Sequence, residues 1–451
     1  MNSDAPAVHA PKGGSGSRKI LIISYSFPPA GGISVQRPLS FAKYLSRLGF
    51  EVHVLSAGTA ASPVIDAGLL RHVPPEVTLH RAFAPVVPFV LRQKIWKVLS
   101  RGGKSGPKPA STVAAPRGWS LRGSVTDLVK QLICPDPEVV WVPFALREAT
   151  KIVKRSGIDT VFVTAPPFSA FLVGNALKRR FPQVRLISDF RDDWVGFYLQ
   201  EFGGLNNANT VRRSKQMERT TAEQSDLVLV VTQAMLTGYR ERYPDLPAGK
   251  FALIPNGYDP ESFASLTRRQ HAGSKVVFTF TGTVYSASSP RTYLEALQRL
   301  PDSIRTQVET RFIGRVADSE KPLLESMQDS VRVLGFLPQN QALQYLQESD
   351  YLLLIMTDPS ALTGKLFEYM ATGKPILALS PIGGEIARIL KETQTGWCVD
   401  PNDSAAIQST LQTLVERAQS DAHAWSPNWD LIRRYERPRL TEALAARIRE
   451  L

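Results

Sequence analysis

The stretch that decides the fold reads Thr363-Gly364-Lys365-Leu366-Phe367-Glu368-Tyr369-Met370-Ala371-Thr372-Gly373-Lys374-Pro375. It lies between two apolar runs, at 351–356 and 375–379. A continuous apolar run is typical of a buried parallel strand, and the glycines predict a turn before the intervening helix and a stop after it. The stretch therefore predicts a strand, a short crossover helix and a second parallel strand.

The turn at Gly364 also has the features of an anion site. A glycine-bearing turn at a helix N-terminus leaves backbone N–H groups unpaired, and these can bind an anion such as a diphosphate. Glu368 follows about one helical turn later, within reach of sugar hydroxyls beside that anion. Phosphate and diol together outline a nucleotide. An ordinary crossover with a solvated glutamate explains the same spacing, so spacing alone leaves both interpretations open.

Apolar runs alternate with helical patterns along most of the chain, which predicts α/β domains built on parallel sheets. The first unit comprises an apolar run at 20–24, a Gly31-Gly32 turn, a helical pattern to about 48 and a strand at 51–55. The pattern restarts beyond Pro255 with a run at 276–281. A chain of 451 residues suits two domains of about 200 residues each.

These patterns set the expected domain boundaries. We expect a flexible leader at 1–18, rich in small and polar residues, and an N-terminal Rossmann-like domain at 19–255 with a surface loop at about 102–123. A C-terminal Rossmann-like domain follows at 256–429, and a last helix occupies 430–451.

Bulk composition excludes several classes of protein. The chain has 43% hydrophobic and 21% charged residues, and no apolar run approaches the roughly 18–20 residues that span a bilayer. Cys134 and Cys398 are the only cysteines, so neither a disulfide framework nor a zinc site is indicated and a cytoplasmic location is the simplest. No zinc-finger spacing, RNA-binding signature or long basic run indicates a nucleic-acid partner.

The net charge of +13 nevertheless favours an anionic partner. One basic group, Arg92-Gln93-Lys94-Ile95-Trp96-Lys97, mixes cations with apolar residues, as does a helix that lies on an acidic membrane surface. A solvated helix face with buried apolar residues has the same pattern. Peripheral contact with the inner face of the cell membrane is therefore a hypothesis beside that simpler interpretation.

Five further motifs occur in one order along the chain. The N-terminal run Lys19-Ile20-Leu21-Ile22-Ile23-Ser24-Tyr25-Ser26-Phe27-Pro28-Pro29 precedes the glycine pair, and Asp189-Phe190-Arg191-Asp192-Asp193-Trp194 and Ile254-Pro255-Asn256-Gly257-Tyr258-Asp259 lie midway. Thr281-Gly282-Thr283 and Gly335-Phe336-Leu337-Pro338 come later. With the stretch at 363–375, which has the form G-K-x-x-E-Y-x-x-x-G-K-P, the chain resembles the GT-B glycosyltransferases of retaining family 4 (glycosyltransferase group 1) from about Lys19 to its C-terminus.

The resemblance implies a fold and a reaction. The fold would be GT-B, in which two Rossmann-like, doubly wound domains face a central cleft and the last helix packs back on the first domain. The reaction would be retaining transfer of a sugar from a nucleotide-sugar donor to a glycan or lipid-linked acceptor, in bacterial surface polysaccharide or glycoconjugate synthesis. No cofactor and no metal are expected: the chain has no Asp-x-Asp, so backbone N–H groups, a helix dipole and cations would stabilise the leaving diphosphate.

The motifs also imply the donor site. Lys365 is the expected cation for the diphosphate, Glu368 would accept hydrogen bonds from the ribose hydroxyls, and Phe336 would lie beside the base or else belong to the core. The expected donor-binding residues are Gly31, Gly32, Gly282, Thr283, Arg291, Phe336, Thr363, Gly364, Lys365 and Glu368.

The expected catalytic residues are Asp189, Arg191 and Asp192, which follow the apolar strand at 185–188. Two carboxylates that flank an arginine can also form a structural ion pair, because buried charges are normally paired. Their place at a strand end, just before Trp194, favours a functional role. We expect Asp189 or Asp192 to orient an acceptor hydroxyl, and the sequence leaves open whether by positioning or as a general base.

Two departures from the family pattern keep other functions open. Typical members have a histidine near the Asp189 motif, whereas this chain has none between His80 and His271. Many also have a glutamate eight positions before the ribose-binding one, where this chain has Ser360. The alternatives are a catalytically silent GT-B partner or scaffold protein and a GT-B-like sugar-nucleotide epimerase. A dinucleotide oxidoreductase is poorly supported, because no Gly-x-Gly-x-x-Gly follows a predicted strand.

Overall fold

The computed structural model describes residues 18–58, 65–85, 131–198, 207–264, 266, 273–359, 362–420 and 425–451. The expected leader, the loop at 102–123, the basic group at 92–97 and Ser360 lie outside the described residues, apart from Arg18 at the end of the leader. Within the described residues, no helix combines the length and the apolar character needed to cross a membrane.

The N-terminal half forms a parallel sheet of seven strands within the described residues, in the order β3-β2-β1-β4-β5-β6-β7. The strands are β1 Lys19–Ser24, β2 Glu51–Ala57, β3 Thr78–Ala82, β4 Thr160–Ala165, β5 Arg185–Phe190, β6 Leu227–Val230 and β7 Phe251–Leu253. The helices are α1 Ile33–Arg47, α4 Val142–Ser156, α5 Ala170–Arg180, α7 Ala208–Gln224 and α8 Gln233–Arg242, with short turns η2 Ala67–His72, η3 Pro137–Trp141, η4 Trp194–Tyr198 and η6 Ala248–Lys250.

The C-terminal half forms a second parallel sheet, of six strands in the described part of the chain, in the order β10-β9-β8-β11-β12-β13. These are β8 Val276–Thr281, β9 Val308–Ile313, β10 Val331–Gly335, β11 Tyr351–Ile355, β12 Ile376–Leu379 and β13 Gly396–Val399. The helices are α9 Glu261–Ala264, α10 Arg291–Gln298, α11 Asp302–Arg305, α12 Lys321–Glu325, α13 Gln339–Gln347, α14 Gly364–Thr372, α15 Glu385–Thr393 and α16 Ser404–Gln419, with the turn η7 Ser286–Ser288.

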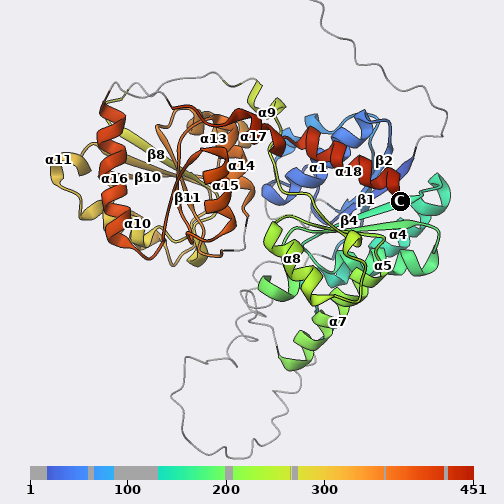
Figure 1. Cartoon of the computed structure of the whole chain (residues 1–451). Coiled ribbons are helices and arrows are strands. Elements are labelled where there is room, and N and C mark those ends of the chain that lie inside the picture. The colour runs from blue at the N-terminus through green and yellow to red at the C-terminus, as the bar shows by residue number, and fades with distance from the viewer. Residues whose placement is uncertain are drawn as a thin grey trace, which may run out of the picture.

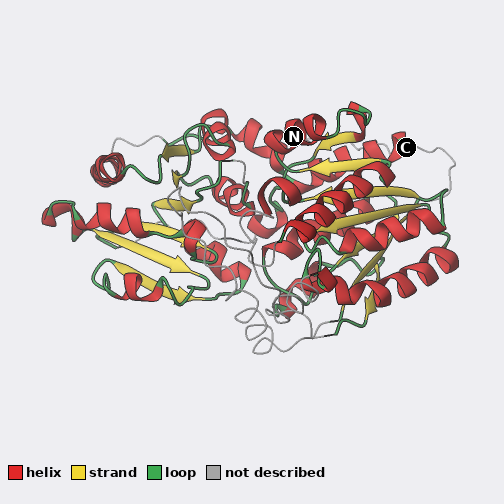
Figure 2. Ribbon diagram, turned by 90° about the horizontal axis from the view of Figure 1, so that it is seen from below, coloured by secondary structure: helices red, strands yellow, loops and turns green. Residues whose placement is uncertain are grey.

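Each sheet is buried on both faces, and Figure 2 shows helices on either side of the first sheet. Leu21 and Ile23 of β1 pack into the core on one face, whereas Ile20 and Ile22 pack into the core on the other. This burial explains why the central strands are continuous apolar runs. The expected α/β architecture of two Rossmann-like domains is confirmed.

The last helices return from the second domain to the first. The segment comprises α17 Trp429–Ile432, the turn η8 Arg433–Tyr435 and α18 Arg437–Glu450, shown in red in Figure 1, where it runs alongside α1. Leu444 and Ile448 of α18 are fully buried in the same core as Leu45 of α1. The first domain is therefore completed by residues from the far end of the chain.

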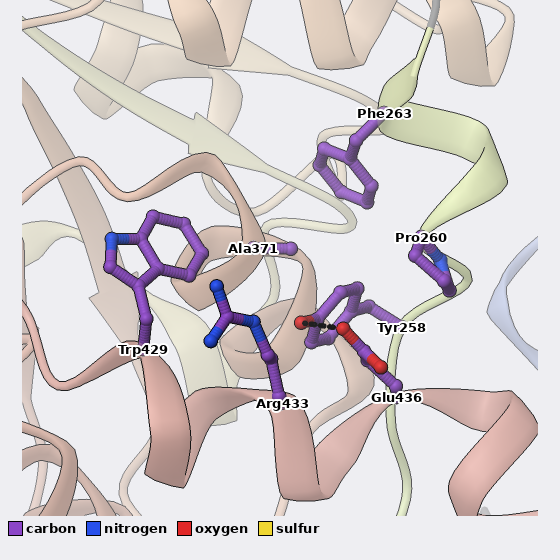
Figure 3. Close-up of a pocket in the computed structure, with 7 residues that line it drawn as sticks. All are labelled: Tyr258, Pro260, Phe263, Ala371, Trp429, Arg433 and Glu436. Atoms are coloured by element: carbon purple, nitrogen blue, oxygen red, sulfur yellow. Dashed lines mark hydrogen bonds between the residues drawn. The ribbon is translucent and has the colours of Figure 1, made fainter. Parts of the chain in front are cut away.

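Two crossings of the chain join the domains. Tyr258, on the outgoing segment, donates its backbone N–H to the Tyr435 carbonyl (3.1 Å) and accepts from the Arg437 N–H (2.9 Å). Gly257 allows this close approach, because a Cβ there would lie 2.2 Å from the Tyr435 oxygen. Figure 3 shows the hollow of about 370 Å³ beside this crossing, lined by Tyr258, Pro260, Phe263, Ala371, Trp429, Arg433 and Glu436.

One polar face of α1 contacts the crossings. The Lys43 ammonium is 2.8 Å from the Asp259 carboxylate, which also accepts a 2.6 Å hydrogen bond from the Tyr44 hydroxyl. Ser40 Oγ accepts a hydrogen bond from Arg437 (2.7 Å). Helix α1 is thus the first-domain element to which the connecting segments are attached.

Candidate functional site

A cleft of about 420 Å³ lies between the carboxyl ends of the two sheets, where ligands bind in open α/β folds. Its first-domain wall consists of Gly32, Gln36, Asp66 and Leu69. The second domain contributes the rest of the lining: Thr281, Gly282, Thr283, Tyr285, Ser288, Gly314, Arg315, Phe336, Leu337, Gln339, Met356, Thr363, Lys365 and Glu368.

Two glycines form the floor of the cleft. Gly282 follows β8 with a φ of +114°, and Gly314 follows β9 with a φ of +133°. A Cβ on Gly314 would lie 2.1 Å from the Gly282 oxygen, and a Cβ on Gly282 would lie 2.4 Å from the Lys365 ammonium. Glycine at these positions therefore lets the two strand ends and the lysine side chain pack in one layer.

Lys365 reaches the floor from the first turn of α14. Its ammonium lies 4.3 Å from the centre of the Phe280 ring, a cation–π contact, and its side chain lines the cleft. Burial from water lowers the pKa of Lys365 to about 8, although the negative charge of Glu368 acts in the opposite direction. A half-buried cation with a lowered pKa favours a negatively charged ligand, whose charge would stabilise the ammonium.

The N-terminus of α14 is held rigidly at the same place. Thr363 caps the helix, and its hydroxyl accepts from the backbone N–H of Lys365. The Tyr369 hydroxyl accepts from the Thr281 N–H (2.8 Å) and donates to the Leu353 carbonyl (3.3 Å). Helix α14 is thereby fixed to β8 and β11, and its positive end opens toward the cleft.

Glu368 faces the cleft one helical turn beyond Lys365. Its Oε1 accepts a 3.2 Å hydrogen bond from Gln339, whose own oxygen accepts a 2.9 Å hydrogen bond from Gln36 of the first domain. Burial raises the pKa of Glu368, whereas Arg437, Gln339 and Lys365 lower it. The cleft therefore combines a cation, a helix N-terminus and a carboxylate.

Of the residues expected to be catalytic, Asp189 is fully buried and lies outside the cleft lining. Its carboxylate forms a bidentate ion pair with Arg37 and accepts a 2.7 Å hydrogen bond from Thr164. Arg37 also donates to the carbonyls of Ile254 and Pro255 at the first crossing. These contacts give Asp189 a structural role at the point where the chain leaves the first domain.

Arg191 and Asp192 are half-buried beside it. The Arg191 guanidinium donates to three backbone carbonyls, those of Ser34 (2.6 Å), Ala165 (3.2 Å) and Pro166 (2.5 Å), and so connects the start of α1 to the end of β4. Burial raises the pKa of Asp192, Arg191 lowers it, and the nearby carboxylate of Asp358 in the second domain raises it further. Asp192 thus lies toward the space between the domains, near but not within the described lining of the cleft.

Some of the remaining predicted residues line the cleft, and others lie outside its described lining. Gly32, Thr283 and the half-exposed Phe336 line the cleft, together with the second-domain residues described above. Gly31 lies beside Gly32 but is not among the described lining residues, and Gly364 contributes through its place at the first position of α14. Arg291 is exposed at the start of α10, outside the described lining.

The structure adds residues that the sequence analysis missed. Arg315, directly after Gly314, lines the cleft in place of the expected Arg291. The first-domain residues Gln36 and Asp66 and the second-domain residue Gln339 also line it. The place of Arg315 just after the end of β9 could have indicated it, whereas the two glutamines carry no recognisable motif. The described residues contain no group of three or more His, Cys, Asp or Glu side chains suited to hold a metal ion.

Comparison with known proteins places this arrangement in a class. A family model for group 1 glycosyl transferases matches residues 275–417, and a model for glycosyltransferase family 4 matches residues 106–262. The fold is similar to that of Anabaena Alr3699/HepE in complex with UDP (TM-score 0.60, 15% identity, 96% of this chain and 100% of that chain). It is also similar to WaaG, a glycosyltransferase involved in lipopolysaccharide biosynthesis (TM-score 0.58, 14% identity, 95% and 99%).

Two curated proteins are similar in sequence over shorter stretches. The probable glycosyltransferase WbjE of Pseudomonas aeruginosa is 31% identical over 148 residues, which cover 32% of this chain and 36% of that protein. The amylovoran biosynthesis glycosyltransferase AmsK of Erwinia amylovora is 30% identical over 114 residues, which cover 24% and 26%. The matches span about a third or less of the length of these relatives.

The fold and the cleft define a two-domain α/β protein of the GT-B class. One family model matches each domain, and both describe glycosyltransferases. These matches, the glycosyltransferase relatives and the similar structures together support a GT-B glycosyltransferase of the group 1 and family 4 type.

Proposed function

We propose that this chain transfers a sugar from a nucleotide-sugar donor to a glycan or lipid-linked acceptor. The observation that carries the proposal is the arrangement of Lys365, the N-terminus of α14 and Glu368 around the glycine floor of one interdomain cleft. The ammonium and the helix N-terminus suit a diphosphate, and the carboxylate one turn away suits a ribose diol.

Uridine is the first choice for the base. Structures of the same fold hold UDP or UDP-glucose in Anabaena Alr3699/HepE, and this supports trying uridine nucleotides before others. In this chain Phe336 and Leu337, which follow β10, and Arg315, which follows β9, belong to the second-domain lining of the cleft. We assign the Phe336 ring to the base, because an aromatic ring can stack on it, and Arg315 to the diphosphate, because its guanidinium can pair with phosphate oxygens.

The proposed reaction balances without a further reactant. The bond between the anomeric carbon and the diphosphate oxygen breaks, and a bond from the acceptor hydroxyl oxygen to that carbon forms. The acceptor proton passes to the departing diphosphate, so the products are the glycoside and the nucleoside diphosphate. Lys365 and the N-terminus of α14 would stabilise the charge that develops on the leaving oxygen. In this proposal the anomeric configuration is retained and no metal takes part.

The proposal assigns the acceptor side to the first domain. Asp192, near the interdomain space, is the better candidate to orient an acceptor hydroxyl, since Asp189 is committed to Arg37. The names of AmsK and WaaG refer to amylovoran and lipopolysaccharide biosynthesis, which supports a glycan or lipid-linked acceptor in bacterial surface polysaccharide synthesis. Peripheral contact with an acidic membrane surface belongs to the same proposal.

Thermal unfolding with a nucleotide panel tests the donor site. The panel contains UDP, GDP, ADP and CMP, first with EDTA and then with Mg²⁺. Binding to the native state alone at 100 times Kd adds about 2.7 kcal/mol to the free energy of unfolding. We expect a metal-independent increase in melting temperature with UDP that disappears in Glu368→Ala. No shift with any nucleotide would favour a silent partner protein, and donor consumption without an acceptor would favour an epimerase.

A further inference from the structure

A chain of hydrogen bonds connects the first domain to Glu368. Gln36 Nε2, on the first turns of α1, donates to Gln339 Oε1 across the cleft (2.9 Å). Gln339 Nε2 in turn donates to Glu368 Oε1 (3.2 Å). All three side chains line the cleft. Gln36 therefore contacts the proposed ribose-binding carboxylate through a single intermediary, Gln339.

The Glu368 carboxylate determines the orientation of the Gln339 amide. Rotating the amide by 180° would place its oxygen against the carboxylate, which is repulsive because a carboxylate only accepts hydrogen bonds. The Gln339 oxygen is therefore left to accept from the NH₂ group of Gln36. Gln339 is also the first residue of α13, directly after Pro338, whose ring restricts the backbone there. Gln339 therefore holds Glu368 in one defined place.

The hydrogen bond from Gln339 is compatible with a bound ribose. A carboxylate has about four lone-pair positions, so Glu368 can accept from Gln339 and from two ribose hydroxyls at once. Arg437, at the second crossing, lowers the pKa of Glu368 and so favours its charged form. Burial is the larger effect and leaves that pKa above its usual value.

The same helix that carries Gln36 also contacts Arg437. Ser40 Oγ donates to the Gln36 carbonyl (2.8 Å) and accepts from Arg437 Nη1 (2.7 Å). Arg437 further donates to the Gly257 carbonyl at the outgoing segment (3.0 Å). One face of α1 is therefore connected both to Glu368, through Gln339, and to the crossings about which the domains would move.

We propose that Gln36, Gln339 and Glu368 form a relay that couples binding of the nucleotide ribose to the approach of the two domains. Gln339 is the positioning residue for Glu368, and Gln36 acts on Glu368 only through Gln339. The inference rests on the proposed nucleotide site and adds to it a specific interdomain coupling. It requires that removing Gln36 has no effect once Gln339 is absent.

A double-mutant cycle on UDP binding by the whole chain tests the relay. We expect Gln339→Ala to weaken UDP binding about fivefold, as for one lost hydrogen bond, and Gln36→Ala to weaken it by a smaller factor of about three. The double variant should bind as Gln339→Ala does. Gln339→Met, which keeps the length of the side chain, should reproduce Gln339→Ala if the alanine variant unfolds. If the double variant weakened UDP binding by the product of the two single-variant factors, the relay would be overturned.

Two controls separate the relay from a general disturbance. Gln344→Ala removes a comparable hydrogen bond, to Glu348, on the same helix but outside the described cleft lining, and it should leave UDP binding unchanged. For 2′,3′-dideoxy-UDP, which lacks the diol, the relay variants should bind as the wild type does, whereas a distorted cleft would weaken binding of both nucleotides and overturn the proposal. Absence of UDP binding by the wild type would instead reject the nucleotide site itself, and the relay with it.

Discussion

Arg37 and Asp189 form a bidentate ion pair in the interior of the first domain, with Nη2 2.7 Å from Oδ1 and Nε 3.0 Å from Oδ2. Both side chains are almost completely buried, at 7% and 0% exposure. The same guanidinium donates to the carbonyls of Ile254 and Pro255, where the chain leaves for the second domain. The pair therefore connects β5, α1 and the outgoing segment.

The first prediction follows from this pair. Asp189→Asn removes the negative charge and leaves the Arg37 cation buried, so we expect the free energy of unfolding to fall by about 3–5 kcal/mol. Denaturant unfolding of the purified chain measures this change. Asp192→Asn is the matched control, because Asp192 is half-buried and its own pKa is raised by burial. Undiminished stability of Asp189→Asn together with lost turnover would contradict the structural role and restore Asp189 as a catalytic residue.

The second prediction concerns Glu368. Each hydrogen bond from a ribose hydroxyl to the carboxylate contributes about 1.5–3 kcal/mol, so Glu368→Ala should weaken UDP binding at least tenfold. The free energy of unfolding without ligand should change little, because Glu368 is half-buried at the cleft surface. Isothermal titration with UDP measures the affinity. Equal UDP affinity in the variant and the wild type would show that Glu368 does not contact the nucleotide.

The central strands of both sheets could be predicted from the sequence, because strands buried on both faces are continuous apolar runs. The predicted runs at 276–281 and 351–356 coincide with β8 and β11 to within one residue. No strand was predicted at β3, β7 or β13, which lie at sheet edges. Edge strands are less completely buried, so β3 carries polar residues such as Thr78 and His80 and shows no apolar run.

The predicted residues that line the cleft belong to the second domain, apart from Gly32. Lys365 and Glu368 belong to a local motif, and their cleft positions follow from the helix that contains them. Asp189 was expected just after a strand but lies within β5, and its long-range partner Arg37, 152 positions away, gives it a structural role. Local spacing does not reveal such a contact. The same limit applies to Gln36 and Gln339, which are 303 positions apart.

The third prediction is a pH dependence of nucleotide binding. Burial lowers the pKa of Lys365 to about 8, so its ammonium is largely charged at pH 7 and largely neutral at pH 9. A diphosphate binds the charged form, and binding above pH 8 must therefore be accompanied by uptake of a proton. The affinity for UDP should fall as the pH rises above about 8, with a slope approaching tenfold per pH unit. Titration calorimetry from pH 7 to pH 9 measures the slope.

Two controls belong to the pH experiment. Uridine, which lacks the diphosphate, reports titration of the base alone and should show no comparable loss of affinity. Lys365→Met should bind UDP weakly at every pH, and it should be more stable than the wild type at pH 7, because the folded chain no longer buries an ammonium. The pKa of Lys365 is lower in the folded chain than in the unfolded chain, so the wild type gains stability as the pH rises from about 8 toward the unfolded pKa. A UDP affinity that is constant over this range would exclude Lys365 as the diphosphate cation.

The fourth prediction separates backbone strain from crowding at the cleft floor. Gly282 and Gly335 both have positive φ, at +114° and +71°, but their surroundings differ. A Cβ at 282 would lie 2.3 Å from Lys365 Cε, whereas a Cβ at 335 would meet nothing within 4 Å. Gly335→Ala therefore adds strain alone, about 1–3 kcal/mol, while Gly282→Ala adds strain and also displaces the ammonium.

We expect both variants to be less stable than the wild type in the absence of ligand. Only Gly282→Ala should also bind UDP more weakly, because it displaces the Lys365 ammonium. The loss should be tenfold or more, since a hydrogen bond to a charged group contributes about 1.5–3 kcal/mol. Binding by Gly282→Ala should also lose its dependence on pH above 8, because the dependence arises from Lys365. If Gly335→Ala weakened UDP binding as much as Gly282→Ala does, general strain of the second domain would explain both losses, and the contact between Gly282 and Lys365 would have no separate role in holding the diphosphate.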